Sequence, residues 1–216
     1  MPTHSDVVNV RALSIRLEDA NSSERIEALE ELQRIARDHP RLVCQEALSR
    51  VLQVLHDQGS SEEYSECLYV LDSLIRVKDQ SVKIENANQL MSEASTVELF
   101  LDLLEHSNPS IGVMTSQILS ELHEASGARL EALIQQCPEG MNKLLQRLPD
   151  SSGAREAVRN QALVLIQQLT RSNEEMMTTV VFNEGLDVLF GIIQKEYDDG
   201  RETEHGVVVQ DCLQVC

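Results

Sequence analysis

A pattern that recurs four times along the chain restricts what the chain can fold into. Four segments of 14 residues share an apolar residue at the fifth position and another at the twelfth. They begin 49, 44 and 45 residues apart, at Cys44, Glu93, Cys137 and Phe182. A period of this length is typical of armadillo and HEAT arrays, in which each repeat buries its apolar face against the next. The chain is therefore predicted to be a stack of helical repeats.

A second apolar helix is expected beside each of these segments. It ends in an L-x-x-L form at Leu71/Leu74, Leu119/Leu122 and Ile166/Leu169, and Leu29/Leu32 supplies an earlier copy. In the segment RNQALVLIQQLTRSN, apolar residues recur with the 3.6-residue period of a helix. Leu163 and Val164 widen this apolar stripe beyond what one neighbour covers. We therefore expect this helix to pack on its own partner and on the next repeat.

Together these patterns predict an all-α fold, a right-handed α-solenoid of armadillo/HEAT-like repeats. Aromatic residues make up only 3% of the chain, which disfavours an all-β fold. We expect a single domain over residues 1–216 with about four repeats. The tail VVVQDCLQVC aligns with QALVLIQQL so that Cys212 matches Ala162, and the final L-x-x-L is missing. The last repeat is thus expected to be incomplete, and the chain to be the front part of a larger head or a truncated product.

Polar residues at the predicted helix starts support this layout. Capping boxes, in which a Ser and a Glu three residues later satisfy free backbone N–H groups, are predicted at Ser60/Glu63, Ser95/Glu98 and Ser172/Glu175. Asn21 and Asn173 are also predicted to begin helices. Pro109 follows Asn108 and fits the first position of a helix, where its missing N–H has no cost.

The charge balance and the cysteines limit the classes of partner. The chain has 36 acidic and 18 basic residues, a net charge of −18, so nucleic acid is not an expected partner and anionic membranes are disfavoured. No apolar run approaches the length of a membrane span, so direct membrane insertion is not expected. The five cysteines include no C-x-x-C pair, which favours reduced thiols in a cytosolic protein.

No catalytic pattern stands out. The six histidines are scattered, no metal-binding set of Cys or His is present, and no Gly-rich phosphate loop occurs. The paired acids Glu30-Glu31, Glu62-Glu63 and Asp198-Asp199 are better explained as solvated helix starts or loops than as acid–base pairs. The sequence therefore predicts a non-enzymatic protein without a cofactor or metal.

From Cys137 onward the sequence resembles a known family. The segments CPEGMNKLLQRL, VRNQALVLIQQLTRSN, VVFNEGLDVLFGIIQKE and GVVVQDCL are similar to the armadillo head of the general vesicular transport factors, the golgin-type tethers of Golgi vesicles. The resemblance implies a cytoplasmic protein peripheral on Golgi and transport-vesicle membranes in ER-to-Golgi and intra-Golgi transport. It implies recruitment by a Rab-type small GTPase, a head that forms a homodimer, and other Golgi tethers and SNAREs as partners. The chain lacks the family's coiled coil and acidic tail. A rival hypothesis is an armadillo-type nucleotide-exchange cofactor of a heat-shock chaperone, which also uses about four repeats.

A partner-binding surface is predicted on the third helix of the repeats. In armadillo arrays this helix often carries a Trp and an Asn that clamp an extended peptide, but the corresponding residues here are Tyr69 and Ser73, Gln117 and Glu121, and Val164 and Gln168. Peptide capture of that kind is therefore disfavoured. The polar residues left on these helices are candidate partner contacts, although solvated side chains are the simpler explanation. The candidate set comprises Gln117, Glu121, Asn160, Gln168 and Arg171.

Overall fold

The structure is a computed structural model that describes residues 2–19, 21–57, 59–137, 139–149, 155–171, 173–198 and 205–215. Within these ranges every regular element is a helix, as predicted. The chain divides into two compact units, one formed by residues 1–96 with 124–126 and the other by residues 97–123 with 127–216. Each unit stacks helices in a row, and the all-α solenoid prediction is confirmed.

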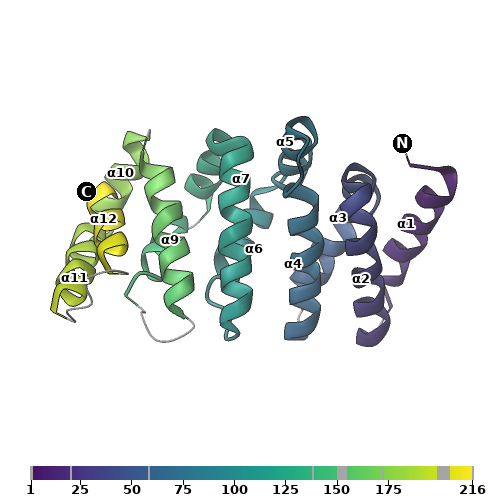
Figure 1. Cartoon of the computed structure of the whole chain (residues 1–216), viewed down its shortest axis with the longest axis horizontal. Coiled ribbons are helices and arrows are strands. Elements are labelled where there is room, and N and C mark those ends of the chain that lie inside the picture. The colour runs from purple at the N-terminus through teal and green to yellow at the C-terminus, as the bar shows by residue number, and fades with distance from the viewer. Residues whose placement is uncertain are drawn as a thin grey trace. The chain divides into compact units, whose positions relative to one another are not determined.

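In the described part of the first unit, five helices are complete. They follow one another from the N-terminus in Figure 1. They are α1 (His4–Arg16), α2 (Ser22–Asp38), α3 (Pro40–His56), α4 (Ser61–Ile75) and α5 (Gln80–Leu90). Helix α2 packs against α4, and α3 packs against both α1 and α4. The predicted L-x-x-L residues of α2 and α4 have no more than 1% of their surface exposed. Burial of these leucines between successive repeats is what drives the stacking.

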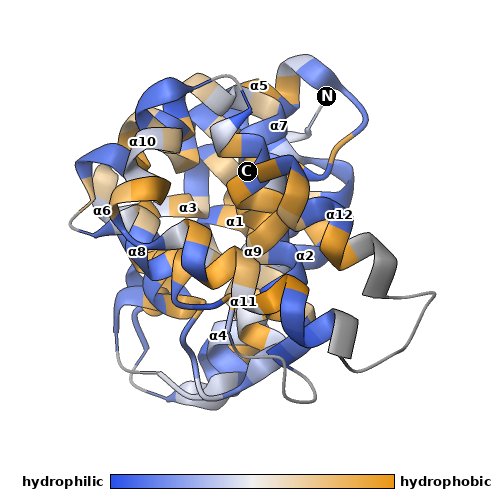
Figure 2. Cartoon of the chain, turned by 90° about the vertical axis from the view of Figure 1, so that its left-hand side faces the viewer, coloured by the Kyte–Doolittle hydropathy of each residue, from blue (hydrophilic) through white to orange (hydrophobic). Residues whose placement is uncertain are grey.

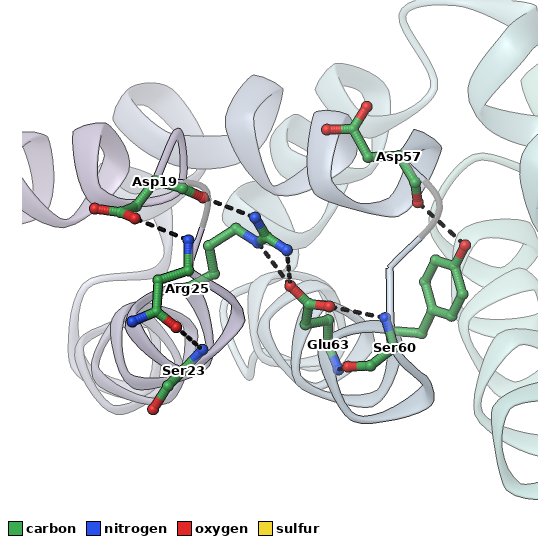
Figure 3. A network of polar contacts seen from close by, with 8 residues as sticks. Asp19, Ser23, Arg25, Asp57, Ser60 and Glu63 are labelled. Atoms are coloured by element: carbon green, nitrogen blue, oxygen red, sulfur yellow. Dashed lines mark hydrogen bonds and ion pairs between the residues drawn. The ribbon is translucent and has the colours of Figure 1, made fainter.

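A polar network joins the starts of α2 and α4 within this unit (Figure 3). The side chain of Ser60 accepts from the backbone N–H of Glu63, and the Glu63 carboxylate accepts from the Ser60 N–H at 2.7 Å. Arg25 donates to Glu63 at 2.6 Å and to the carbonyl oxygen of Asp19 at 2.7 Å. Burial opposes ionisation of Glu63, but the hydrogen bonds from Ser60 and Arg25 outweigh it, so the pKa of Glu63 is lowered. The predicted capping box at Ser60 is confirmed.

The second unit contains most of α6 and α7 and all of the later helices. They are α6 (Ala94–Leu103), α7 (Pro109–Gln136), α8 (Gly140–Leu145), α9 (Arg155–Thr170), α10 (Glu174–Phe182), α11 (Gly185–Asp198) and α12 (His205–Val215). Helix α7 is interrupted at Ser126, whose φ of −156° and ψ of 58° are not helical. Helix α9 packs on α8, α10 and α12, so it has the several neighbours that its wide apolar stripe predicts.

The repeat assignment from sequence matches these helices. The four recurring segments form α3, α6, α8 and α11, and the L-x-x-L helices are α2, α4, the part of α7 before Ser126, and α9. The structure adds a short helix before three of the recurring segments: α5, the part of α7 after Ser126, and α10. Cys212 and Ala162, which the sequence alignment matches, are both fully buried.

Two predicted helix starts need comment. The prediction at Ser95 is wrong, because α6 already begins at Ala94 and the Ser95 hydroxyl donates to the Glu93 carboxylate at 3.3 Å. Ser172 lies outside the described residues. Asn173 caps α10 as predicted, since its side chain accepts from the N–H groups of Glu175 and Met176. Asn21 and Asn108 likewise cap α2 and α7, and Pro109 is the first residue of α7.

Among the described residues no single helix is long and apolar enough to span a membrane. Only α10 and the apolar part of α11 reach that length and hydropathy when taken together, and these two helices meet at a bend of 75°.

Candidate partner-binding surface

The five candidate residues all fall in the second unit, on or next to two helices. Gln117 and Glu121 lie one turn apart on α7. Asn160 and Gln168 lie two turns apart on α9, and Arg171 directly follows that helix. Arg171 is exposed, and the other four side chains are half-buried. Gln117 and Glu121 occupy in α7 the repeat positions that Val164 and Gln168 occupy in α9.

Helices α7 and α9 are in direct contact at their starts. A Cβ atom added to Gly112 of α7 would lie 3.2 Å from Cγ2 of Val158 in α9 and 3.2 Å from the carbonyl oxygen of Leu104. Such distances leave almost no room for a side chain, so glycine permits the close approach of these helices. The candidate residues therefore lie on two helices that pack together within one unit.

Asn160 is hydrogen-bonded to one member of a buried ion pair that sequence reasoning missed. Arg159 is only 1% exposed, and its Nη1 donates to Oε1 of Glu196 in α11 at 2.8 Å. Its Nε donates to the side-chain oxygen of Asn160 at 3.0 Å, and Glu156 lies 3.5 Å away. The Asn160 side chain thus helps to hold the Arg159 guanidinium in its orientation. The signal in the sequence was an arginine three residues before Ala162, on the buried stripe of α9.

Amide side chains dominate the rest of this surface. The side-chain oxygen of Gln168 is buried and accepts no hydrogen bond from the described residues. Beside it, the amide of Gln167 donates to the side-chain oxygen of Gln214 in α12. A buried acceptor without a donor costs free energy, and an internal water can satisfy it. Gln168 is therefore the candidate residue with an unmet hydrogen-bonding requirement.

The equivalent face of the first unit is acidic. Tyr69 of α4 is 43% exposed, and the Ser73 hydroxyl donates to the Tyr69 carbonyl oxygen rather than outward. Burial and the negative charges of Glu30 and Glu62 raise the pKa of Glu66. The Trp and Asn residues of peptide-binding armadillo repeats are replaced here by Tyr69 and Ser73, as the sequence indicates.

The thiols of the described cysteines are buried. Burial raises the pKa of the Cys44 thiol to about 12 and also raises those of Cys67 and Cys137. These thiols are therefore protonated at neutral pH and weak nucleophiles. Among the described residues, no three His, Cys, Asp or Glu side chains are grouped so that they could hold a metal ion.

Comparison with known proteins identifies relatives over almost the whole chain. No family model matches it. The chain is 38% identical to Golgin candidate 6 of Arabidopsis thaliana over 129 residues, which is 60% of this chain and 13% of that protein. It is 26% identical to the general vesicular transport factor p115 of Homo sapiens over 226 residues, which is 98% of this chain and 23% of that protein. The chain thus spans less than a quarter of the length of these relatives.

Solved structures agree on the fold. A crystal structure of Uso1-2 superposes with a TM-score of 0.82 at 20% identity and covers 100% of this chain and 36% of that chain. A computationally designed armadillo repeat protein for modular peptide recognition gives a TM-score of 0.75 at 18% identity and covers 95% of this chain and 81% of that chain. The predicted resemblance is confirmed, and it reaches well before Cys137, where the sequence alone showed only a similar layout.

Proposed function

We propose, on the premise that the chain is a homologue of the general vesicular transport factors, that it is a non-enzymatic interaction module of a vesicle-tethering factor. The similarity over 98% of the chain to a protein named for vesicular transport carries this proposal. The site of action is the cytoplasmic face of Golgi and transport-vesicle membranes. The chain acts there as one repeat domain that binds proteins on its solvent-facing helices.

The proposed partners are a Rab-type small GTPase, other Golgi tethers and SNAREs, and a second copy of the chain. The proposed GTPase contact is the α7–α9 surface with Gln117, Glu121, Asn160, Gln168 and Arg171. One observation supports this choice. Arg171 supplies an exposed cation at the end of α9, three residues after Gln168, in a chain of net charge −18. An interface with both charged and amide groups selects its partner by electrostatic and hydrogen-bond complementarity.

A pull-down with immobilised Golgi Rab tests the proposal. We expect the purified chain to bind the GTP-locked Rab and to bind the GDP-locked form at least about tenfold more weakly, a ratio typical of coupling between two states of a switch. Binding that is equal in both states, or absent, would contradict the proposal. Stimulated nucleotide release from a seventy-kilodalton chaperone would instead support the exchange-cofactor hypothesis.

A matched pair of variants tests the surface. Arg171 follows the end of α9 as Arg76 follows the end of α4 in the first unit. Both substitutions make the same change in net charge. Arg171→Glu should weaken Rab binding because Arg171 lies on the proposed surface, whereas Arg76→Glu in the first unit should leave binding unchanged. If the two substitutions weaken Rab binding equally, the weakening comes from the electrostatic field of the whole protein, and the α7–α9 surface is not the contact.

A further inference from the structure

A groove runs along α10 in the second unit, away from the residues considered so far. It has two adjoining parts that share Gln135 and Thr179 as lining residues. One part has a volume of about 290 Å³ and lies between the end of α7, the start of α8 and α10. The other has a volume of about 590 Å³ and follows the first turns of α10. Helix α10 packs against α8, which places both walls in one unit.

The first part of the groove has an apolar floor, and polar side chains line both parts. Ile134, Met141 and Met176 line the first part, and each has at most 4% of its surface exposed. The walls carry side-chain amides and hydroxyl groups, whose oxygens can accept from the N–H groups of a peptide backbone. These are Gln135, Asn142, Thr178, Thr179 and Asn183. The Thr178 and Thr179 hydroxyls themselves donate to backbone carbonyl oxygens of α10.

All charged residues that line the groove in the described part of the chain are acidic. They are Glu139 in the first part of the groove and Glu174 and Glu175 in the second. Two of these carboxylates are held in place by amides: Asn142 donates to Glu139 at 3.0 Å, and Gln135 donates to Glu175 at 3.1 Å. The groove therefore presents oriented negative charge next to apolar surface.

We propose that this α10 groove binds an extended peptide segment that carries Lys or Arg residues. Carboxylates on both parts of the groove match cationic head groups, and the apolar floor matches the aliphatic stems of Lys and Arg. An extended segment is favoured over a helix because its backbone N–H groups are unpaired and can donate to the side-chain oxygens of the walls. The ligand is thus a basic stretch of a partner protein, and this site is separate from the α7–α9 surface of the proposed function.

Fluorescence anisotropy with the full chain tests this proposal. The probe is a short labelled peptide of alternating Lys and Ser, compared with one of alternating Glu and Ser. We expect the basic peptide to bind and the acidic peptide not to bind. The double substitution Glu139→Gln and Glu174→Gln should weaken binding about tenfold, because it removes charge from both parts of the groove.

A matched control separates the groove from the general negative field. Glu30→Gln with Glu62→Gln makes the same charge change on the acidic face of the first unit, and it should leave the affinity unchanged. Equal weakening by both double variants, or no binding of the basic peptide to the parent chain, would overturn the proposal.

A gain-of-function variant provides an independent readout. Glu139→Lys with Glu174→Lys should reverse the preference, so that the acidic peptide binds better than the basic one. Circular dichroism establishes that each variant is folded. Thr179→Arg, which places a bulky cation where the two parts of the groove adjoin, should abolish binding of the basic peptide without changing either wall carboxylate; retained binding would also overturn the proposal.

Discussion

The buried ion pair between Arg159 and Glu196 gives the sharpest test of how the second unit is held together. Only 2% of the Arg159 side chain and 5% of the Glu196 side chain are exposed, and the charged atoms lie 2.8 Å apart. The pair joins α9 to α11. Substitution of Arg159 by Leu places an apolar residue of good helix propensity in the buried stripe, but it leaves the buried Glu196 carboxylate without the guanidinium.

Removal of one partner of a buried pair typically costs about 3–5 kcal/mol, because the remaining charge stays desolvated. We expect Arg159→Leu to lower the free energy of unfolding by this amount. Replacement of both partners by Leu removes the desolvation problem, so the double variant should be as stable as the parent chain to within about 1 kcal/mol, or more stable. The comparison of the single and double variants isolates the cost of burying the Glu196 carboxylate in the absence of Arg159.

Urea denaturation followed by far-ultraviolet circular dichroism measures these free energies, since the chain has no Trp to report on unfolding. Hydrogen exchange of α9 and α11 peptides shows whether the loss is local to the second unit. If Arg159→Leu costs less than about 1 kcal/mol, or if the double variant is as unstable as the single one, the pair does not contribute in the way its burial indicates.

Three further predictions follow from burial and pKa shifts. Leu169→Ala should lower the free energy of unfolding by about 2–5 kcal/mol, because Leu169 is fully buried. Leu213 is 57% exposed, so Leu213→Ala should lower it by less than about 1 kcal/mol in the same urea titration. Similar values for the two variants would show that Leu169 is not part of the core. The pKa of Glu63 is lowered on folding, so its stabilisation is present above the unfolded pKa and lost as the pH falls through the folded value. The stability difference between the parent chain and Glu63→Gln should therefore be largest near pH 7 and close at acidic pH, and a difference that persists in acid would contradict this sign. Cys44 and Cys67 should not react with a thiol reagent at pH 8 in the folded chain but should react fully in urea; rapid labelling of the folded chain would show that these thiols are accessible.

The places of the candidate residues on α7 and α9 were accessible to sequence reasoning because a repeat alignment assigns equivalent positions, whereas their role in partner binding stays a prediction. Gln117 and Gln168 could be placed on solvent-facing helices without coordinates, since the L-x-x-L residues nearby had to point inward. What the alignment could not reveal was that the Asn160 side-chain oxygen already accepts a hydrogen bond from Arg159. Side-chain pairing depends on the direction of each side chain, and the period of a helix does not determine it.

The sequence by itself determined the helical class and the repeat period, and its segments from Cys137 onward indicated a resemblance to the general vesicular transport factors. The helical class and the period follow from local spacing: apolar residues 3.6 positions apart can only be buried by a helix, and their recurrence about every 45 residues requires neighbours of the same kind. Local capping chemistry also set several helix starts, among them those at Asn21, Ser60 and Asn173.

Only the tertiary structure decided which distant polar groups meet. The Arg159–Glu196 pair spans 37 residues, and the α10 groove combines residues from α7, α8 and α10. Such sites arise from the way successive repeats stack, because the packing of buried leucines sets the distance between helices and so determines which side chains on their edges face one another. Two sequences with the same apolar period can therefore share this fold and still present different binding surfaces.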